Sequence, residues 1–153
     1  EVGMNINEEG LQIIKDFEGF SSSAYLCPAN RWTIGYGSTW DKSRKPVTKD
    51  HPDVSEEEAE QLLMQEVYHS QYAIDKLLSC ELTENMYSAL CSFVYNIGSG
   101  NFQRSTMRMK LNRGDYYGAS AEFPKWRKAG GRILKGLVKR RIVEKELFDR
   151  DLS

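Results

Sequence analysis

The feature that most constrains the fold is a long amphipathic helix in the middle of the chain. It begins at Ser55-Glu56-Glu57-Glu58, a capping box in which the serine side chain accepts a hydrogen bond from the third helical amide while a glutamate reaches back. Helical spacing then continues for about six turns, through Ala59, Leu62, Leu63, Val67, Ala73, Ile74, Leu77 and Leu78. Because this helix is long for a chain of 153 residues, we expect it to join two lobes.

The residues before the long helix predict a small mixed lobe. Apolar positions between residues 8 and 18 share one face of a short helix, which Gly19 ends as a left-handed cap. Residues 20–36 alternate polar residues with aromatic and β-branched ones around Pro28-Ala29-Asn30, a pattern typical of a β-hairpin. Residues 40–53 have the composition of a loop, with room for a third short strand.

The residues after the long helix predict a mostly helical lobe. Thr83 begins a helix that Gly98-Ser99-Gly100 closes, Ser105 or Thr106 begins the next, and Asn112-Arg113-Gly114-Asp115 forms a turn and N-cap. After breaks at Pro124 and Gly130-Gly131 we expect a basic amphipathic helix, with apolar positions at Leu137, Val138, Ile142, Val143, Leu147 and Phe148.

Together these elements predict an α+β fold with two lobes. The parts are a mixed lobe with a β-hairpin sheet over about residues 4–54, a linking helix over 55–78 and a helical lobe over 79–153. Glu1-Val2-Gly3 reads as the remnant of an expression tag before Met4, so we treat residues 4–153 as one domain. Ligands favour the cleft between such lobes, and we expect the site there.

Charge is distributed unevenly along the chain. Residues 1–103 hold 7 Lys and Arg against 16 Asp and Glu, whereas residues 104–153 hold 14 against 6. This difference indicates either a basic surface for a polyanion or a set of solvated helix faces. With 40% hydrophobic and 28% charged residues the composition excludes a mainly disordered chain, and no apolar stretch approaches the roughly 20 residues of a membrane span.

The cysteines and histidines indicate no metal and no cofactor. Cys27, Cys80 and Cys91 are odd in number and lack the spacing of metal ligands, which predicts reduced thiols rather than a disulfide framework. His51 and His69 have no acidic or metal-binding partner at a useful spacing, so we assign them no catalytic role.

Glu18 is the leading candidate for chemistry. It falls at the C-terminal end of the first helix, where the helix dipole disfavours negative charge, so we expect its carboxyl group to hold a proton more firmly than an isolated glutamate. A glycosidase needs such a group to donate a proton to a leaving sugar oxygen. The alternative is a solvated glutamate that happens to end a helix.

Cys27 and Thr33 are the candidates in the hairpin. A three-residue loop at Ala29-Asn30-Arg31 would place them opposite each other on one face, whereas a two-residue loop would not. Taken alone, Cys27 is more often a small buried residue and Thr33 an ordinary strand residue.

These residues belong to runs that resemble the phage-type lysozymes, or endolysins, of glycoside hydrolase family 24. The runs are Asp16-Phe17-Glu18-Gly19-Phe20, Ala24-Tyr25, Trp32-Thr33-Ile34-Gly35-Tyr36-Gly37, Ala89-Leu90-Cys91-Ser92-Phe93-Val94-Tyr95-Asn96-Ile97-Gly98, Asn101-Phe102, Ser105-Thr106, Leu111-Asn112-Arg113-Gly114-Asp115, Trp126, Ala129-Gly130-Gly131, Leu134, Gly136-Leu137 and Arg140-Arg141. That family carries a Glu, eight residues, an Asp or Cys, five residues and a Thr, which Glu18, Cys27 and Thr33 match in full. The likeness covers about residues 8–148.

The resemblance implies a bilobal, lysozyme-like fold and hydrolysis of the β-1,4 bond between N-acetylmuramic acid and N-acetylglucosamine in peptidoglycan. It implies Glu18 as the general acid, Cys27 in place of the second catalytic group and Thr33 as a holder of the attacking water, with inversion at the sugar carbon. Further contacts to the glycan strand are implied at Tyr36, Gly37, Asn96, Phe102 and Gln103.

Cys27 is a departure from the many relatives that carry Asp. A free thiol has a pKa near 8.5, so it must be tuned to act as a base at neutral pH. Cys27 then either acts as a thiolate that orients and deprotonates water, or attacks the sugar itself with retention. A third possibility is oxidative control through a disulfide with another cysteine.

Two other functions compete with hydrolysis. One is a peptidoglycan-binding protein of the same fold that is catalytically weak or inactive; the other is a membrane-active or nucleic-acid-binding protein that uses the basic tail from Arg104 to Arg150. No nucleic-acid motif supports binding to nucleic acid, while the C-terminal helix could make weak contact with an anionic envelope. We expect a monomer and, if Met4 is the natural start, synthesis in a bacterial cytoplasm without a signal peptide and access to the wall through a membrane pore.

Overall fold

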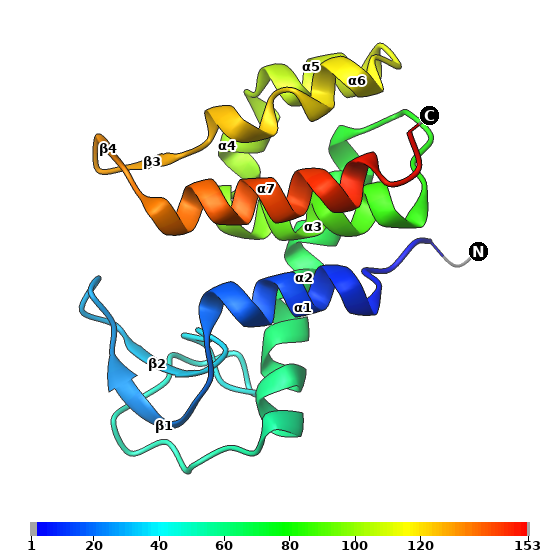
Figure 1. Cartoon of the computed structure of the whole chain (residues 1–153). Coiled ribbons are helices and arrows are strands. Elements are labelled where there is room, and N and C mark those ends of the chain that lie inside the picture. The colour runs from blue at the N-terminus through cyan, green and yellow to red at the C-terminus, as the bar shows by residue number, and fades with distance from the viewer. Residues whose placement is uncertain (1–2, 153) are drawn as a thin grey trace. The chain divides into compact units, whose positions relative to one another are not determined.

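The computed structural model describes residues 3–152 and has an α+β architecture (Figure 1). Its elements are α1 (Glu8–Glu18), β1 (Ser21–Leu26), β2 (Trp32–Gly35), α2 (Glu56–Leu77), α3 (Glu84–Ile97), α4 (Ser99–Gln103), α5 (Thr106–Asn112), α6 (Tyr116–Ser120), a 3-10 turn at Phe123–Lys125, β3 (Lys128–Ala129), β4 (Arg132–Ile133) and α7 (Lys135–Asp149). Of the expected tag remnant only Gly3 lies within the described residues.

The chain divides into two compact units. The helical unit holds the residues up to Phe17 together with those from Ser70 onward, and the hairpin unit holds Glu18–His69. The helix α2 contributes its first part to the hairpin unit and its last part to the helical unit. None of the helices within the described range is long and apolar enough to cross a membrane.

The boundaries of α1 confirm the prediction for residues 8–18. Asn7 begins the helix, because its side-chain oxygen accepts a hydrogen bond from the Gly10 amide at 3.0 Å. The Asn7 amide donates to Ser88 Oγ at 2.8 Å, and a Cβ on Gly10 would lie 2.7 Å from Ser88 Cβ. Glycine therefore allows α1 to approach α3 closely within the helical unit.

The capping box of α2 is confirmed. The Glu58 amide donates to Ser55 Oγ at 3.1 Å, and the Ser55 amide donates to Glu58 Oε1 at 3.0 Å. These reciprocal hydrogen bonds satisfy two amides that a helix terminus otherwise leaves without a partner.

The predicted hairpin is present, but its register differs from the expected pairing of Cys27 with Thr33. Tyr25 pairs with Thr33, and the Cys27 amide donates to the Arg31 carbonyl at 2.9 Å. The turn therefore spans Pro28-Ala29-Asn30, and Asn30 takes the left-handed conformation with φ 62°. In place of a third strand, residues 40–53 contribute one isolated bridge between Trp40 and Pro46.

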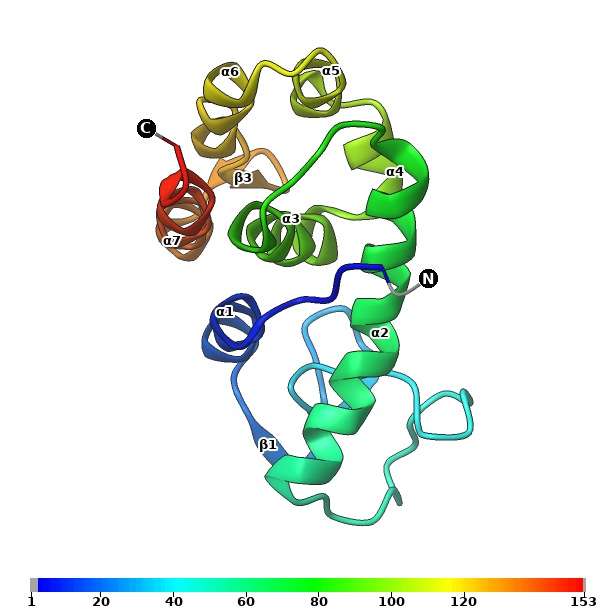
Figure 2. The same ribbon diagram turned by 90° about the vertical axis from the view of Figure 1, so that its right-hand side faces the viewer.

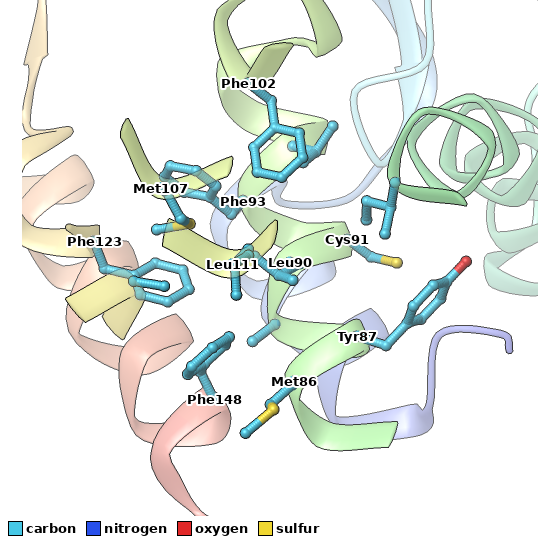
Figure 3. Packing of buried hydrophobic residues seen from close by; sticks show 14 of the residues in the cluster. Met86, Tyr87, Leu90, Cys91, Phe93, Phe102, Met107, Leu111, Phe123 and Phe148 are labelled. Carbon is cyan, nitrogen blue, oxygen red and sulfur yellow. The ribbon is translucent and has the colours of Figure 1, made fainter. Parts of the chain in front are cut away.

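An aromatic core fills the helical unit (Figure 3). Phe123 lies between two other phenylalanines, with ring centroids 5.1 Å from Phe93 and 5.5 Å from Phe148, in edge-to-face geometry. All three side chains are fully buried. These side chains come from α3, the 3-10 turn and α7. The helices α3 and α7 lie side by side in both views (Figures 1 and 2).

Three local features differ from the sequence-based expectations. The Gly98-Ser99-Gly100 segment begins the short helix α4 rather than only closing α3, and Gly130-Gly131 forms the turn of a small antiparallel hairpin, β3–β4. In α7, Ile142 and Val143 are exposed while Arg140 and Arg141 are buried. The buried face of α7 is therefore partly ionic, which the apolar pattern did not predict.

Candidate active site

Glu18 is the last residue of α1 and lies against a glycine of the turn after β2. Gly37 has φ 84°, and a Cβ placed on it would lie 2.8 Å from Glu18 Oε1. Real Cβ atoms do not approach an oxygen so closely, so any side chain at residue 37 would displace the carboxyl group. The absence of a side chain at Gly37 therefore leaves room for the Glu18 carboxyl group in its present position.

The turn that carries Gly37 is closed by backbone hydrogen bonds. Ile34 and Ser38 exchange two N–H···O bonds of 2.9 Å, so that Gly35, Tyr36 and Gly37 form a tight loop. A Cβ on Gly35 would lie 2.9 Å from Ala59 Cβ, so glycine also lets α2 pack against this loop. The Tyr36 ring is largely buried and lies 5.3 Å from the Phe20 ring, centroid to centroid.

The Cys27 thiol, just after the end of β1, is close to several hydrogen-bond donors. The Arg31 amide, then the Thr33 hydroxyl, and more weakly the Ala29 amide, lower the pKa of Cys27 from its usual range, against an opposing effect of burial. Hydrogen bonds to a thiolate favour the charged form because they replace part of its hydration. The thiol is therefore tuned toward the thiolate that a base or a nucleophile needs.

Thr33 links the two sides of the hairpin. Its side chain is buried at 3% exposure, and its Oγ1 donates to the Arg31 carbonyl at 3.0 Å. The hydroxyl carries a single proton, so donation to Cys27 and donation to Arg31 are alternatives. Although the strand register is not the expected one, Cys27 and Thr33 are diagonal neighbours, and the structure brings their side chains together.

Of the expected glycan contacts, Asn96, Phe102 and Gln103 lie in the helical unit. Asn96 lines an open pocket of about 260 Å³ together with Ile97, Asn101, Trp126, Lys128, Ala129, Leu137 and Arg141. Phe102 is fully buried in the aromatic core, so its ring presents no face to a sugar, and we correct that assignment. Gln103 is exposed at the end of α4.

A buried ionic cluster lies next to this pocket, and one of its members, Arg141, is among the residues that line the pocket. Glu144 is fully buried, and its Oε2 accepts hydrogen bonds from Ser92 Oγ at 2.5 Å and Arg140 Nε at 3.1 Å. Its Oε1 forms an ion pair with Arg141 Nε at 2.8 Å. Arg141 also donates to Asn96 Oδ1 at 2.8 Å, which fixes the orientation of the amide at the pocket wall. Sequence reasoning missed this role, because adjacent basic residues on a helix are usually solvated; the Arg140-Arg141 run within the family motif was the available signal.

The side chains of Glu18, Cys27 and Thr33 suit acid–base chemistry. Among residues 3–152 no cluster of three His, Cys, Asp or Glu side chains could hold a metal ion, and all three cysteines are free. A carboxyl group at a helix end can donate a proton, and a thiol beside a hydroxyl can accept one. These groups suit a hydrolase that works by acid–base catalysis.

Comparison with known proteins agrees with this class. Residues 15–144 match the family described as phage lysozyme, and the chain belongs to that family. It is 45% identical over 150 residues to the endolysin of Acyrthosiphon pisum secondary endosymbiont phage 1, covering 95% of this chain and 99% of that protein. The protein is accordingly a lysozyme.

Two further relatives extend the comparison. The endolysin of Bacillus phage B103 is 42% identical over 149 residues, covering 95% of this chain, which spans 54% of the length of that relative. The solved structure of the endolysin from Escherichia coli O157:H7 phage FAHEc1 superposes with a TM-score of 0.89 at 31% identity, covering 99% of this chain and 98% of that chain. The fold thus matches over nearly its whole length.

Proposed function

We propose that this lysozyme is a muramidase that hydrolyses the β-1,4 bond between N-acetylmuramic acid and N-acetylglucosamine in peptidoglycan and so lyses the host cell. The observation that carries the proposal is the hydrogen bond between the Thr33 hydroxyl and the Cys27 thiol, on a hairpin whose following turn places Gly37 against the Glu18 carboxyl group. The membership of the phage lysozyme family supports the same reaction.

In this proposal Glu18 is the general acid. Its carboxyl proton passes to the glycosidic oxygen as the bond from that oxygen to the sugar carbon breaks. Gly37 leaves room for the carboxyl group, whereas any larger residue would move it away from its position on the turn. Tyr36 supports the same turn through its contact with Phe20.

The Cys27 thiolate is the general base. It removes a proton from a water molecule held by the Thr33 hydroxyl, and the water oxygen forms the new bond to the sugar carbon with inversion. The step ends with a protonated thiol and a Glu18 carboxylate, which exchange their protons with solvent. Direct attack by the thiolate would instead give a covalent intermediate and retention.

The second candidate function is glycan binding without hydrolysis, which the Cys27 substitution for the usual Asp favours. The lowered pKa of Cys27 supports hydrolysis instead, because it increases the fraction of thiolate that can act as a base. We propose a monomer that acts on glycan strands of the cell wall, with Asn96 and Gln103 as further contacts and with neither nucleic acid nor a cofactor involved.

Clearing of purified peptidoglycan tests the proposal. We expect the intact protein to release reducing-end muropeptides, Glu18→Gln to lose at least about a hundredfold in rate, and Cys27→Asp to retain activity. Proton NMR of the first product distinguishes inversion from retention. Binding to the pellet with no release of fragments by the intact protein would overturn the hydrolase mechanism in favour of glycan binding.

A further inference from the structure

A basic surface projects from the helical unit at the β3–β4 hairpin and the beginning of α7 (Figure 1). We call it the hairpin patch and define it as Arg127, Lys128, Arg132, Ile133, Leu134, Lys135, Lys139, Ile142 and Val143. All of these residues are exposed. Between Pro124 and Val143 the sequence holds no acidic residue.

The five cations of the hairpin patch have no ion-pair partner among the described residues. The other basic side chains nearby are paired, since Lys125 contacts Glu122 at 2.6 Å, and Arg140 and Arg141 contact Glu144. The two nearest carboxylates along the chain, those of Glu122 and Glu144, are both buried. The positive charge of the patch is therefore left for an external partner.

The helix dipole makes this placement of charge unfavourable for the isolated protein. Lys135 is the first residue of α7, where the dipole is positive, and the first turn has no acidic residue. The N-cap, Leu134, provides no side-chain hydrogen bond to the first amides. Cations and uncapped helical amides together form a surface that suits phosphate oxygens.

Apolar side chains accompany these cations. Ile133 in β4 is 56% exposed, and Leu134 follows it in the chain. In α7, Lys135, Lys139 and Ile142 recur at helical spacing on one face, and Ile142 is 52% exposed. Exposed isoleucine and leucine beside unpaired lysine and arginine are typical of surfaces that insert into the interface of a bilayer.

The β3–β4 hairpin is short and has a tight turn of two glycines. Its strands have two residues each, and Gly130 and Gly131 both take positive φ values, 57° and 79°. Two successive residues with positive φ form the tight turn that suits the twist of a hairpin. Residues 127–136 are exposed without interruption, so the hairpin presents both its charges and Ile133.

We propose that the hairpin patch docks the protein on a membrane surface rich in anionic phospholipid. Headgroup phosphates bind Arg132, Lys135 and the first amides of α7, while Ile133 and Leu134 enter the region below the headgroups. Nucleic acid also offers phosphates, but it offers no apolar layer for these two side chains. This function is separate from the chemistry of Glu18 and Cys27.

Co-sedimentation with vesicles tests the docking. The intact protein is mixed with vesicles of phosphatidylglycerol and phosphatidylcholine, or of phosphatidylcholine alone, at low and high salt. We expect binding to the anionic vesicles that is at least about tenfold stronger than to neutral ones and that weakens with salt. The double variant Arg132→Gln/Lys135→Gln should bind roughly tenfold to thirtyfold more weakly.

Two further variants separate lipid insertion from charge alone. Ile133→Ser keeps every charge and should weaken vesicle binding roughly tenfold, whereas Lys42→Gln/Lys49→Gln, in the hairpin unit, removes two exposed charges and should leave it unchanged. Hydrolysis of soluble muropeptide oligomers shows that each variant is folded. The proposal would be overturned if the intact protein bound neutral vesicles as tightly as anionic ones, or if Lys42→Gln/Lys49→Gln lost as much affinity as Arg132→Gln/Lys135→Gln. It would also be overturned if Ile133→Ser kept its affinity for vesicles while the intact protein bound a DNA duplex more tightly than vesicles.

Discussion

The two units of this lysozyme are stabilised in different ways. The helical unit has an aromatic core around Phe93 and Phe123 and a fully buried ionic cluster at Glu144. The hairpin unit buries aliphatic residues instead, among them Ile34 and Leu63, and its turns are closed by backbone hydrogen bonds. The helical unit therefore depends on aromatic packing and a buried charge cluster, whereas the hairpin unit, which carries Glu18, Cys27 and Thr33, depends on its turns and on aliphatic packing.

Truncation of the aromatic core should give the largest effect on stability. We expect Phe123→Ala to lower the free energy of unfolding by about 3–5 kcal/mol, because it leaves a cavity between two buried rings. Chemical denaturation measures the loss. The control is Phe20→Ala in the hairpin unit, where the ring is 42% exposed and the loss should be well below that of Phe123→Ala.

Removal of the charge on Glu144 should be nearly as damaging. We expect Glu144→Gln to lower the free energy of unfolding by about 3–5 kcal/mol, because the Arg140 and Arg141 guanidinium groups then stay buried without a counter-ion. Thermal unfolding measures it against Glu146→Gln, an exposed glutamate of the same helix. Similar melting temperatures for the two variants would contradict a supporting role for the cluster.

A methyl group at Gly37 should separate activity from stability. We expect Gly37→Ala to lose activity at least about tenfold through displacement of the Glu18 carboxyl group, and to lose about 1–2 kcal/mol of stability from its positive φ. Gly114→Ala is the matched control, because Gly114 has φ 77° and open space around it. It should lose similar stability and keep full activity; inactivation of both variants would show that strain alone is responsible.

The pH dependence of kcat/KM should report the hydrogen bond between Thr33 and Cys27. Removal of the hydroxyl in Thr33→Val raises the pKa of Cys27, so less thiolate is present at a given pH. The acidic limb of the profile should therefore move to higher pH, by about one unit or less. Thr33→Ser keeps the hydroxyl and should leave the limb in place; a shift toward lower pH in Thr33→Val would exclude the thiolate as base.

Loss of the helix cap at Ser55 should have the smallest effect. Ser55→Ala removes the acceptor for the Glu58 amide and should lower the free energy of unfolding by about 1 kcal/mol. The rate of peptidoglycan hydrolysis should stay unchanged, because Ser55 lies outside the hairpin and outside the turn that carries Gly37. Denaturation curves and clearing assays on the same sample check both statements.

Elements with a local cause could be predicted from the sequence. The capping box at Ser55, the glycine after Glu18 and the Thr83 side chain, which accepts from the Met86 amide at 3.1 Å, each act within one helical turn. The resemblance to the phage lysozymes, carried by Glu18, Cys27 and Thr33, likewise indicated the candidate site from the sequence. The sequence left the hairpin register open, because turns of three residues at 28–30 and at 29–31 both suit it, and the structure adopts the turn at 28–30.

Features that depend on distant segments could not be predicted. Phe102 reads as an exposed ring beside Gln103, but packing against Phe93 from another helix buries it. Arg140 and Arg141 read as part of a basic surface, but the Glu144 carboxylate one turn later and Ser92 on α3 draw them into the interior. The basic surface of the C-terminal segment is therefore smaller than the sequence indicates, and the hairpin patch is its exposed part around β3–β4 and the beginning of α7.

The long helices, the glycine-rich turns and the family could be predicted from the sequence, because capping, backbone conformation and motif spacing act over short stretches of chain. The same spacing proposes Glu18, Cys27 and Thr33 as the candidate site. Tertiary structure alone decided that Gly37 lies against the Glu18 carboxyl group and that a buried carboxylate holds Arg141 toward Asn96. The physical reason is that burial and hydrogen-bond donors around a charged group come from segments far apart in the chain. The chemistry of a residue therefore depends on neighbours that its own segment does not specify.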